Sequence, residues 1–249
     1  MYHATASYDG LLVTLSFLVS VFGSYTGLQM VKGLRQSTGL AQYAWLVAAA
    51  VALGAGGIWT MHFIGMIAYH TQMEVGYDAF ITFLSMLIAV TVAGIGIFIL
   101  HKNQTSYLYV LIAGFITGLG IASMHYTGME AMVVAADISY DPILFTLSVL
   151  IAIVASTTAL WLAFNLNNPL PIAVASVVMG IAICGMHYTG MAAMIMTPNH
   201  DIISIESSIR PFTLGVYIFC FSMVTLVLSL AVTLNQLERR LSESVLRAH

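Results

Sequence analysis

The hexapeptide MHYTGM stands at residues 124–129 and returns unchanged at residues 186–191. A variant, MHFIGM, stands at residues 61–66. The histidines of the three copies lie 63 and 62 residues apart, and each copy falls inside a long apolar run. Self-similarity at a fixed period indicates a repeated structural unit, so the motif predicts an architecture of three equivalent units.

A second landmark recurs in step with the motif. An aspartate ahead of an apolar run can cap the first turn of a helix and complements the positive end of the helix dipole. We therefore interpret the chain as three two-helix units followed by a seventh helix, with the motif late in the second helix of each unit. The landmark is a Tyr-Asp pair that precedes the first apolar run of every unit, at Tyr8-Asp9, Tyr77-Asp78 and Tyr140-Asp141.

The composition excludes a soluble protein. The chain has 249 residues, of which 60% are hydrophobic and 7% are charged, whereas about 25% of the residues of a soluble domain are charged. The mean hydropathy of +0.96 points the same way. Both cysteines fall in apolar runs, which argues against a disulfide framework. We expect a multi-pass protein of the lipid bilayer with no nucleic-acid partner.

Seven apolar stretches are long enough to cross a membrane, since a spanning helix needs about 20 apolar residues. The links between them are short, and most carry the polar, glycine or proline residues that are typical of turns. The predicted fold class is an all-α membrane protein of seven transmembrane helices. The predicted spans are residues 10–31, 43–68, 79–100, 107–132, 142–164, 170–195 and 212–236.

The basic residues indicate how these helices are oriented, because cytoplasmic loops carry an excess of lysine and arginine. The predicted orientation has the N-terminus outside and the C-terminus in the cytoplasm. No basic segment precedes the first apolar run, so we expect no cleaved signal peptide. With seven spans, Arg210 falls on the outer side, and the cytoplasmic side receives Lys32, Arg35, Lys102, Arg239, Arg240 and Arg247.

This orientation places the three motifs at one depth. The second helix of every unit runs outward, so the histidines all lie nearer the outer face. Units packed around a pseudo-threefold axis would bring the three histidines together. A retinal protein is excluded, because a retinal Schiff base needs a lysine inside the bundle and both lysines, Lys32 and Lys102, stand at cytoplasmic helix ends.

Each motif offers an imidazole and a thioether side by side. Positions i, i+3 and i+4 of a helix share a face, and the glycine at i+3 permits close helix packing in a membrane. The methionine before each histidine lies about 100° away around the helix and could serve a second layer. The aligned triplets are His62-Gly65-Met66, His125-Gly128-Met129 and His187-Gly190-Met191, and the preceding methionines are Met61, Met124 and Met186.

Imidazole with thioether is a soft ligand set, which favours copper and especially Cu(I). Glu130 lies within a span but is not repeated, so we interpret it as a local hydrogen-bond partner, although it could also neutralise a cation or relay a proton. Cys184 shares a face with His187, and a thiolate ligand in that one unit stays open. Phe63 replaces the tyrosine found at 126 and 188, so a hydroxyl there is not required in every unit.

MHYT repeated in alternate helices of a seven-span bundle resembles the MHYT domain, an integral-membrane sensor domain of bacteria, over essentially the whole chain. The resemblance implies copper coordinated near the outer face by the motif's methionines and histidines, and sensing of a diatomic gas such as oxygen, nitric oxide or carbon monoxide. It further implies the bacterial inner (cytoplasmic) membrane. Family members are joined to cytoplasmic diguanylate cyclase or cyclic-di-GMP phosphodiesterase domains, while the sensor module itself is no enzyme.

The C-terminal sequence fits a sensor. A 3-4-3-4 spacing of apolar residues forms a heptad seam that continues past the last span. We predict a seven-span sensor domain over residues 1–236 and the start of a cytoplasmic signalling helix or linker over residues 237–249. A homodimer through the seventh helix is part of this prediction. The seam residues are Val227, Leu230, Leu234, Leu237 and Leu241.

We therefore predict a membrane sensor that binds a metal, copper in the first place, and responds to a gas or to redox state. Three alternatives stay open at this point. The first is a haem protein in which two of the histidines are axial ligands. The second is a metal-ion or proton transporter that uses the same ligands transiently, and the third is a redox enzyme. The predicted metal ligands are His62, His125 and His187, then Met66, Met129 and Met191, then Met61, Met124 and Met186.

Overall fold

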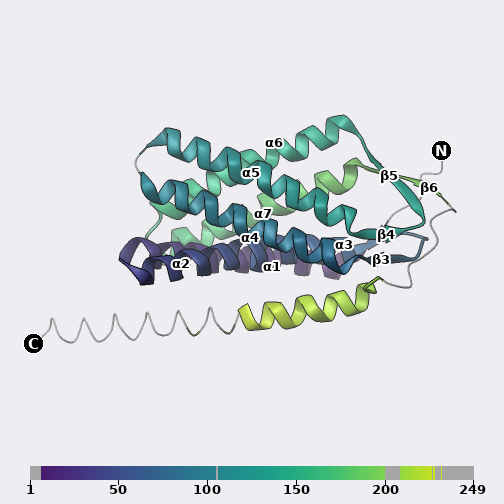
Figure 1. Ribbon diagram of the computed structural model, residues 1–249, viewed down its shortest axis with the longest axis horizontal. Helices are drawn as coiled ribbons and strands as arrows, with labels where there is room; N and C mark the ends of the chain where they lie inside the picture. The colour runs from purple at the N-terminus through teal and green to yellow at the C-terminus, as the bar shows by residue number, and fades with distance from the viewer. Residues whose placement is uncertain (1–6, 105, 200–207, 226, 228–230, 232–249) are drawn as a thin grey trace, which may run out of the picture.

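The computed structural model describes residues 7–104, 106–199 and 208–225, together with residues 227 and 231. Its helices lie side by side along the long axis of the molecule, and the short strands gather at one end of the bundle (Figure 1). The helices of the bundle are α1 (Gly10–Gln36), α2 (Leu40–Ala50), η1 (Val51–Trp59), α3 (Thr60–Ala68), α4 (Ala79–Lys102), α5 (Tyr107–Glu130), α6 (Pro142–Asn165) and α7 (Pro169–Ala193).

Six of the described helices are long and apolar enough to cross a membrane, with α2, η1 and α3 counted as one continuous span over Leu40–Ala68. They agree with six of the seven predicted spans to within a few residues. The predicted seventh span overlaps a shorter apolar helix, Pro211–Thr225, here called the C-terminal helix. Apart from residues 227 and 231, the rest of that span lies outside the described residues, as do residues 237–249 and most of the heptad seam.

The threefold repeat governs the end of the bundle that carries the strands. Every unit closes with a two-stranded antiparallel sheet: β1 pairs with β2, β3 with β4, and β5 with β6. Strands were not among the expectations, which treated these links as turns. Their bounds are β1 (Ser7–Tyr8), β2 (Tyr69–His70), β3 (Val75–Tyr77), β4 (Met132–Val134), β5 (Ala136–Tyr140) and β6 (Met194–Pro198).

The repeated aspartates fasten the two helices of each unit together. Each caps its helix, because its carboxylate accepts from backbone N–H groups of the first turn. Each also donates its own backbone N–H to the end of the second helix of its unit, with N–O distances of 2.7–2.9 Å. The predicted capping is therefore confirmed, and it sets the depth of the motif relative to the first helix. The pairs are Asp9 with Ala68, Asp78 with Ala131, and Asp141 with Ala193.

The first unit departs from the other two in the middle of its second helix. The segment η1 is a π-helix that contains three glycines and ends at Trp59, three residues before His62. A Cβ atom on Gly23 of α1 would collide with the backbone of Gly57, so α1 and η1 touch through bare backbone here. Wide turns of this kind often lie beside functional sites. One uninterrupted helix was predicted over residues 43–68, and nothing in the sequence alone indicated the π-helical segment.

Candidate metal centre

The three motif histidines meet at the centre of the bundle. His62 lies on α3, His125 on α5 and His187 on α7, and their side chains are 1%, 0% and 0% exposed. Their Nδ1 atoms form a nearly regular triangle. The distance is 3.0 Å from His62 to His187, 3.0 Å from His62 to His125 and 3.4 Å from His125 to His187. The predicted convergence of the three units is thus present in the structure.

The glycines of the motif make this convergence possible. A Cβ atom on Gly128 would collide with Nε2 of His62, and one on Gly190 would collide with Nε2 of His125. A Cβ atom on Gly65 would collide with Nε2 of His187 in the same way. Each glycine therefore leaves space for the imidazole of another unit. The three contacts connect the units in a closed cycle. A contact between helices was predicted at these positions, and the structure places an imidazole there.

Hydrogen bonds alone cannot account for all three contacts between the Nδ1 atoms. In a neutral imidazole each Nδ1 is either a donor or an acceptor, and a hydrogen bond needs one of each. Within a closed set of three atoms at least one pair must be alike, so donor faces donor or acceptor faces acceptor. A cation bound by the three nitrogens would interact favourably with all three lone pairs at once.

The size of the triangle suits a first-row transition metal. A point equidistant from the three Nδ1 atoms lies about 1.8 Å from each, close to the metal–imidazole bond of about 2.0–2.1 Å. An ion slightly off the plane of the nitrogens reaches that bond length without any movement of the rings. The three Nε2 atoms lie buried against the motif glycines and make no hydrogen bond. The histidine group could therefore hold a metal ion.

The six methionines of the motifs are buried around this centre. Their exposed fractions do not exceed 3%, and five of them belong to one apolar cluster with Trp59, Phe63 and Tyr77. The structure thus places thioethers at the depth of the histidines. Their role as ligands stays a prediction. The residues are Met61, Met66, Met124, Met129, Met186 and Met191.

Two other candidate ligands point elsewhere. Glu130 is exposed at the end of α5, and its Oε1 accepts a hydrogen bond from the Tyr140 hydroxyl at 3.5 Å. The Cys184 thiol lies 3.8 Å from Ser20 Oγ on α1. Among the described residues, the cluster of potential metal-binding side chains at the centre contains histidines alone. The interpretation of Glu130 as a local hydrogen-bond partner agrees with this contact.

Three buried serines, here called the serine ring, form hydrogen bonds with aromatic residues of the motif helices. They were not predicted from the sequence. Ser16 Oγ lies 3.0 Å from the Tyr188 hydroxyl, and Ser148 Oγ lies 2.6 Å from the Tyr126 hydroxyl. In the unit that has Phe63, the indole Nε1 of Trp59 donates to Ser85 Oγ at 3.1 Å. The sequence does carry a signal for this ring, because in each unit the serine follows the capping aspartate by seven residues.

The tyrosines of the Tyr-Asp pairs pack over the aromatic residue that follows each histidine. Their ring centroids lie 5.5 Å apart for Tyr8 with Tyr188, and 5.1 Å apart for Tyr140 with Tyr126. For Tyr77 the partner is Phe63, at 6.0 Å. Burial raises the pKa of the Tyr77 hydroxyl well above its ordinary value. The Tyr77 ring packs on Phe63 in the interior of the bundle.

The fold and the centre together define an α-helical membrane protein with a threefold repeated histidine site. The chain belongs to the MHYT family, described as a bacterial signalling protein N terminal repeat, which matches residues 56–113, 118–176 and 180–245. The three matched segments together cover most of the chain. No solved structure matches the chain.

Three curated relatives are signalling proteins. The bifunctional diguanylate cyclase/cyclic di-GMP phosphodiesterase MucR of Pseudomonas aeruginosa is 42% identical over 76% of this chain and 28% of its own length. The cyclic di-GMP phosphodiesterase NbdA of the same organism is 37% identical over 96% of this chain and 31% of its own. The signaling protein YkoW of Bacillus subtilis is 34% identical over 88% and 29%. The chain thus spans less than a third of each relative.

Proposed function

We propose that the chain is a membrane-embedded input domain that holds one copper ion on the Nδ1 atoms of His62, His125 and His187 and reports a diatomic gas or a redox change to a cyclic-di-GMP output domain. The observation that carries the proposal is the triangle of buried Nδ1 atoms, which hydrogen bonding cannot satisfy and a cation can. Copper would supply an open coordination position or a one-electron redox step.

The surroundings of the triangle favour copper over harder metals. Three imidazoles and six buried thioethers form a soft set of donors, and soft donors select Cu(I). Structural zinc sites use thiolate or carboxylate ligands more often. Non-haem iron sites usually add a carboxylate, and the described Glu130 lies exposed at the end of its helix. The methionines are proposed as further or transient ligands.

The geometry disfavours the haem alternative. Two axial imidazoles on opposite sides of an iron would hold their nitrogens about 4 Å apart, at metal–nitrogen bonds of about 2.0–2.1 Å. The Nδ1 atoms here are 3.0–3.4 Å apart and face one another directly. A macrocycle has no place between them. Three equivalent nitrogens around one point suit a single small ion.

The proposed orientation puts the centre near the outer face of the bacterial inner membrane. Arg35 and Lys102 lie in the last turns of α1 and α4, at the end of the bundle opposite the strands (Figure 1). Lys32 Nζ donates to the backbone oxygen of Asn167 in the link between α6 and α7, at 2.6 Å. Because basic residues mark the cytoplasmic side, the strands and the nearby histidines lie toward the outside.

The proposal is tested in a fusion of this chain to a cyclic-di-GMP output domain, reconstituted in liposomes. Carbon monoxide and nitric oxide are added to the copper-loaded protein while output activity is recorded. We expect a change in activity that is lost in His125→Ala and kept in His101→Ala, a control histidine on α4 outside the centre. An equal gas response in both variants would contradict the proposal. Copper flux into sealed vesicles would instead support a transporter.

A further inference from the structure

The first unit differs from the other two at Trp59, just before the motif, and at Phe63 and Ile64 within it, and Trp59 and Phe63 share an apolar cluster with Leu214 and Ile218 of the C-terminal helix. Phe63 stands where the other units have Tyr126 and Tyr188. Trp59 stands where they have Ala122 and Cys184. The two large aromatic side chains of the first unit therefore have no counterpart pair in the second or third unit.

Trp59 links the centre to the C-terminal helix. Its Nε1 donates to Ser85 Oγ at 3.1 Å and so takes the place of the missing tyrosine hydroxyl. Its ring lies 5.1 Å from Phe63, which in turn packs against the imidazole of His62 at 4.7 Å. The other side of the indole meets Phe221 of the C-terminal helix in an edge-to-face contact at 6.2 Å. Three ring contacts therefore join His62 to this helix.

Tyr77 makes a second link between the same two elements. Its ring packs on Phe63. Its backbone N–H donates to Ile209 at 2.9 Å and its carbonyl accepts from Ile209 at 2.8 Å, just before the C-terminal helix begins. Tyr77 is 1% exposed, whereas its counterpart Tyr8 is 40% exposed. Within the described ranges, such a bridge is present at Tyr77 and at neither Tyr8 nor Tyr140.

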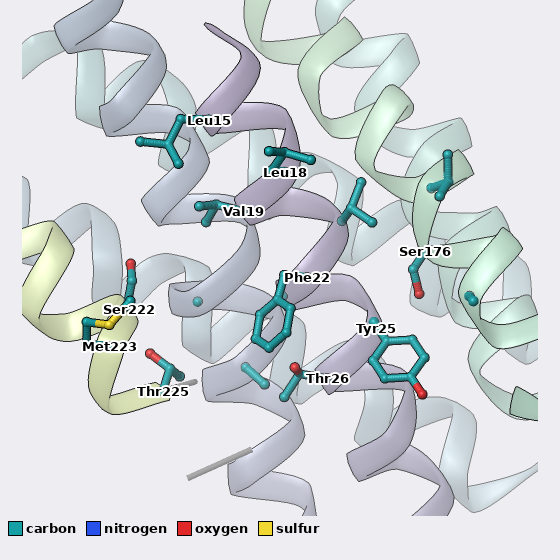
Figure 2. A pocket seen from close by; sticks show the side chains of 16 residues that line it. Leu15, Leu18, Val19, Phe22, Tyr25, Thr26, Ser176, Ser222, Met223 and Thr225 are labelled. Atoms are coloured by element: carbon teal, nitrogen blue, oxygen red, sulfur yellow. The ribbon is translucent and has the colours of Figure 1, made fainter. Parts of the chain in front are cut away.

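The C-terminal helix is buried against the bundle in its first half and borders a cavity in its second half. Leu214 and Ile218 are buried in the same apolar cluster as Trp59 and Phe63. Further along the helix, a cavity of about 640 Å³ lies between Ser222, Met223 and Thr225 and side chains of α1 and α7 (Figure 2). The lining of that cavity is almost wholly apolar and includes none of the motif histidines. This arrangement gives the second half of the helix room to shift while its first half stays packed against the cluster around Trp59 and Phe63.

We infer that Trp59, Phe63 and Tyr77 couple the histidine centre to the C-terminal helix. On this inference the first unit carries the signal out of the centre, while the second and third units complete the ligand set. The inference rests on the proposed function for the nature of the signal. Coupling between two places in a protein has to be measured and does not follow from proximity, so the test compares variants that the repeat itself matches.

The first test restores the repeat. Trp59→Ala with Phe63→Tyr gives the first unit the side chains of the second, Ala122 and Tyr126. A ¹⁹F-labelled phenylalanine at position 221 reports on the helix in full-length protein in nanodiscs, and Cu(I) alone is the probe. We expect Cu(I) to shift the ¹⁹F resonance in the parent protein. In the double variant the shift is lost, and copper affinity changes by less than about threefold, below the 10–100-fold typical of lost supporting contacts. A shift retained in full would overturn the inference.

The second test needs no metal and separates this inference from the proposed function. In metal-free protein, Tyr77→Ala is expected to move the ¹⁹F resonance at position 221, and its counterpart Tyr140→Ala is expected to leave it in place. His62→Ala should likewise move it more than His125→Ala. Equal shifts from both members of each pair would overturn the coupling. If the parent protein bound no copper, the proposed function would be wrong. The comparison of these metal-free variants would still test the coupling.

Discussion

The triple variant His62→Ala/His125→Ala/His187→Ala is expected to bind no copper, whereas the parent chain retains one ion. The expectation follows from the triangle of Nδ1 atoms, which supplies all three imidazole donors and stands in the interior of the bundle. The measurement is elemental analysis of detergent-purified protein, with competition against a Cu(I) chelator to obtain the affinity. Loss of one imidazole alone should lower the affinity by orders of magnitude, because it leaves two of the three nitrogens.

His101→Ala is the matched control for the triple variant. That histidine lies near the end of α4 and hydrogen-bonds to Gln42 at 2.8 Å, away from the centre. Copper content equal to that of the parent protein is expected. If the triple variant kept its copper while remaining folded, the ion would be held by other groups, with the buried methionines as the first to examine.

The second large effect is expected from Gly128→Ala. The added methyl group would occupy the space of His62 Nε2, and neither the backbone of α5 nor the buried ring has open space nearby. Overpacking of this kind costs about 1–3 kcal/mol of stability, and displacement of the ring removes one ligand. We therefore expect a fall in copper affinity of at least about 100-fold, at the upper end of what lost supporting contacts typically cause. The ring of glycine contacts predicts similar losses for Gly65→Ala and Gly190→Ala.

Gly185→Ala is the control for these substitutions. It lies on α7, one residue before Met186, and a Cβ atom there meets nothing within 4 Å. Alanine is favoured over glycine inside a helix by about 1 kcal/mol, so this variant should bind copper normally and unfold at an equal or higher temperature. Normal copper affinity in Gly128→Ala would show that the imidazole does not need the space that the glycine leaves.

The fold and the histidine cluster were predicted from the periodicity of the sequence. The 63- and 62-residue intervals, together with the alternation of spans, place His62, His125 and His187 at one depth, and the structure brings their Nδ1 atoms together. The repeated aspartates were predicted as caps for a local reason, and local interactions are readable from sequence. The spacing of residues along the chain was therefore enough to predict the features that follow from helix geometry, namely the common depth of the histidines and the helix caps.

Features that depend on packing between units could not be read in the same way. The π-helical turn η1 depends on the contact between Gly23 and Gly57, which are far apart in the chain. The glycine of each motif was expected to contact a neighbouring helix, whereas in the structure it leaves space for an imidazole from another unit. The roles of Ser85 and Trp59 emerge only when α4 lies against η1, since nothing in either segment alone names the other as its partner.

X-ray absorption at the copper edge, with metal content determined on the same purified sample, tests the central proposal most directly. One copper per chain, with three imidazole nitrogens at about 2.0–2.1 Å, is the predicted result, with or without an added sulfur shell from the methionines. Three coppers per chain, each with a single histidine, would contradict a shared centre. A fully folded protein that takes up no copper at all would contradict the metal sensor itself.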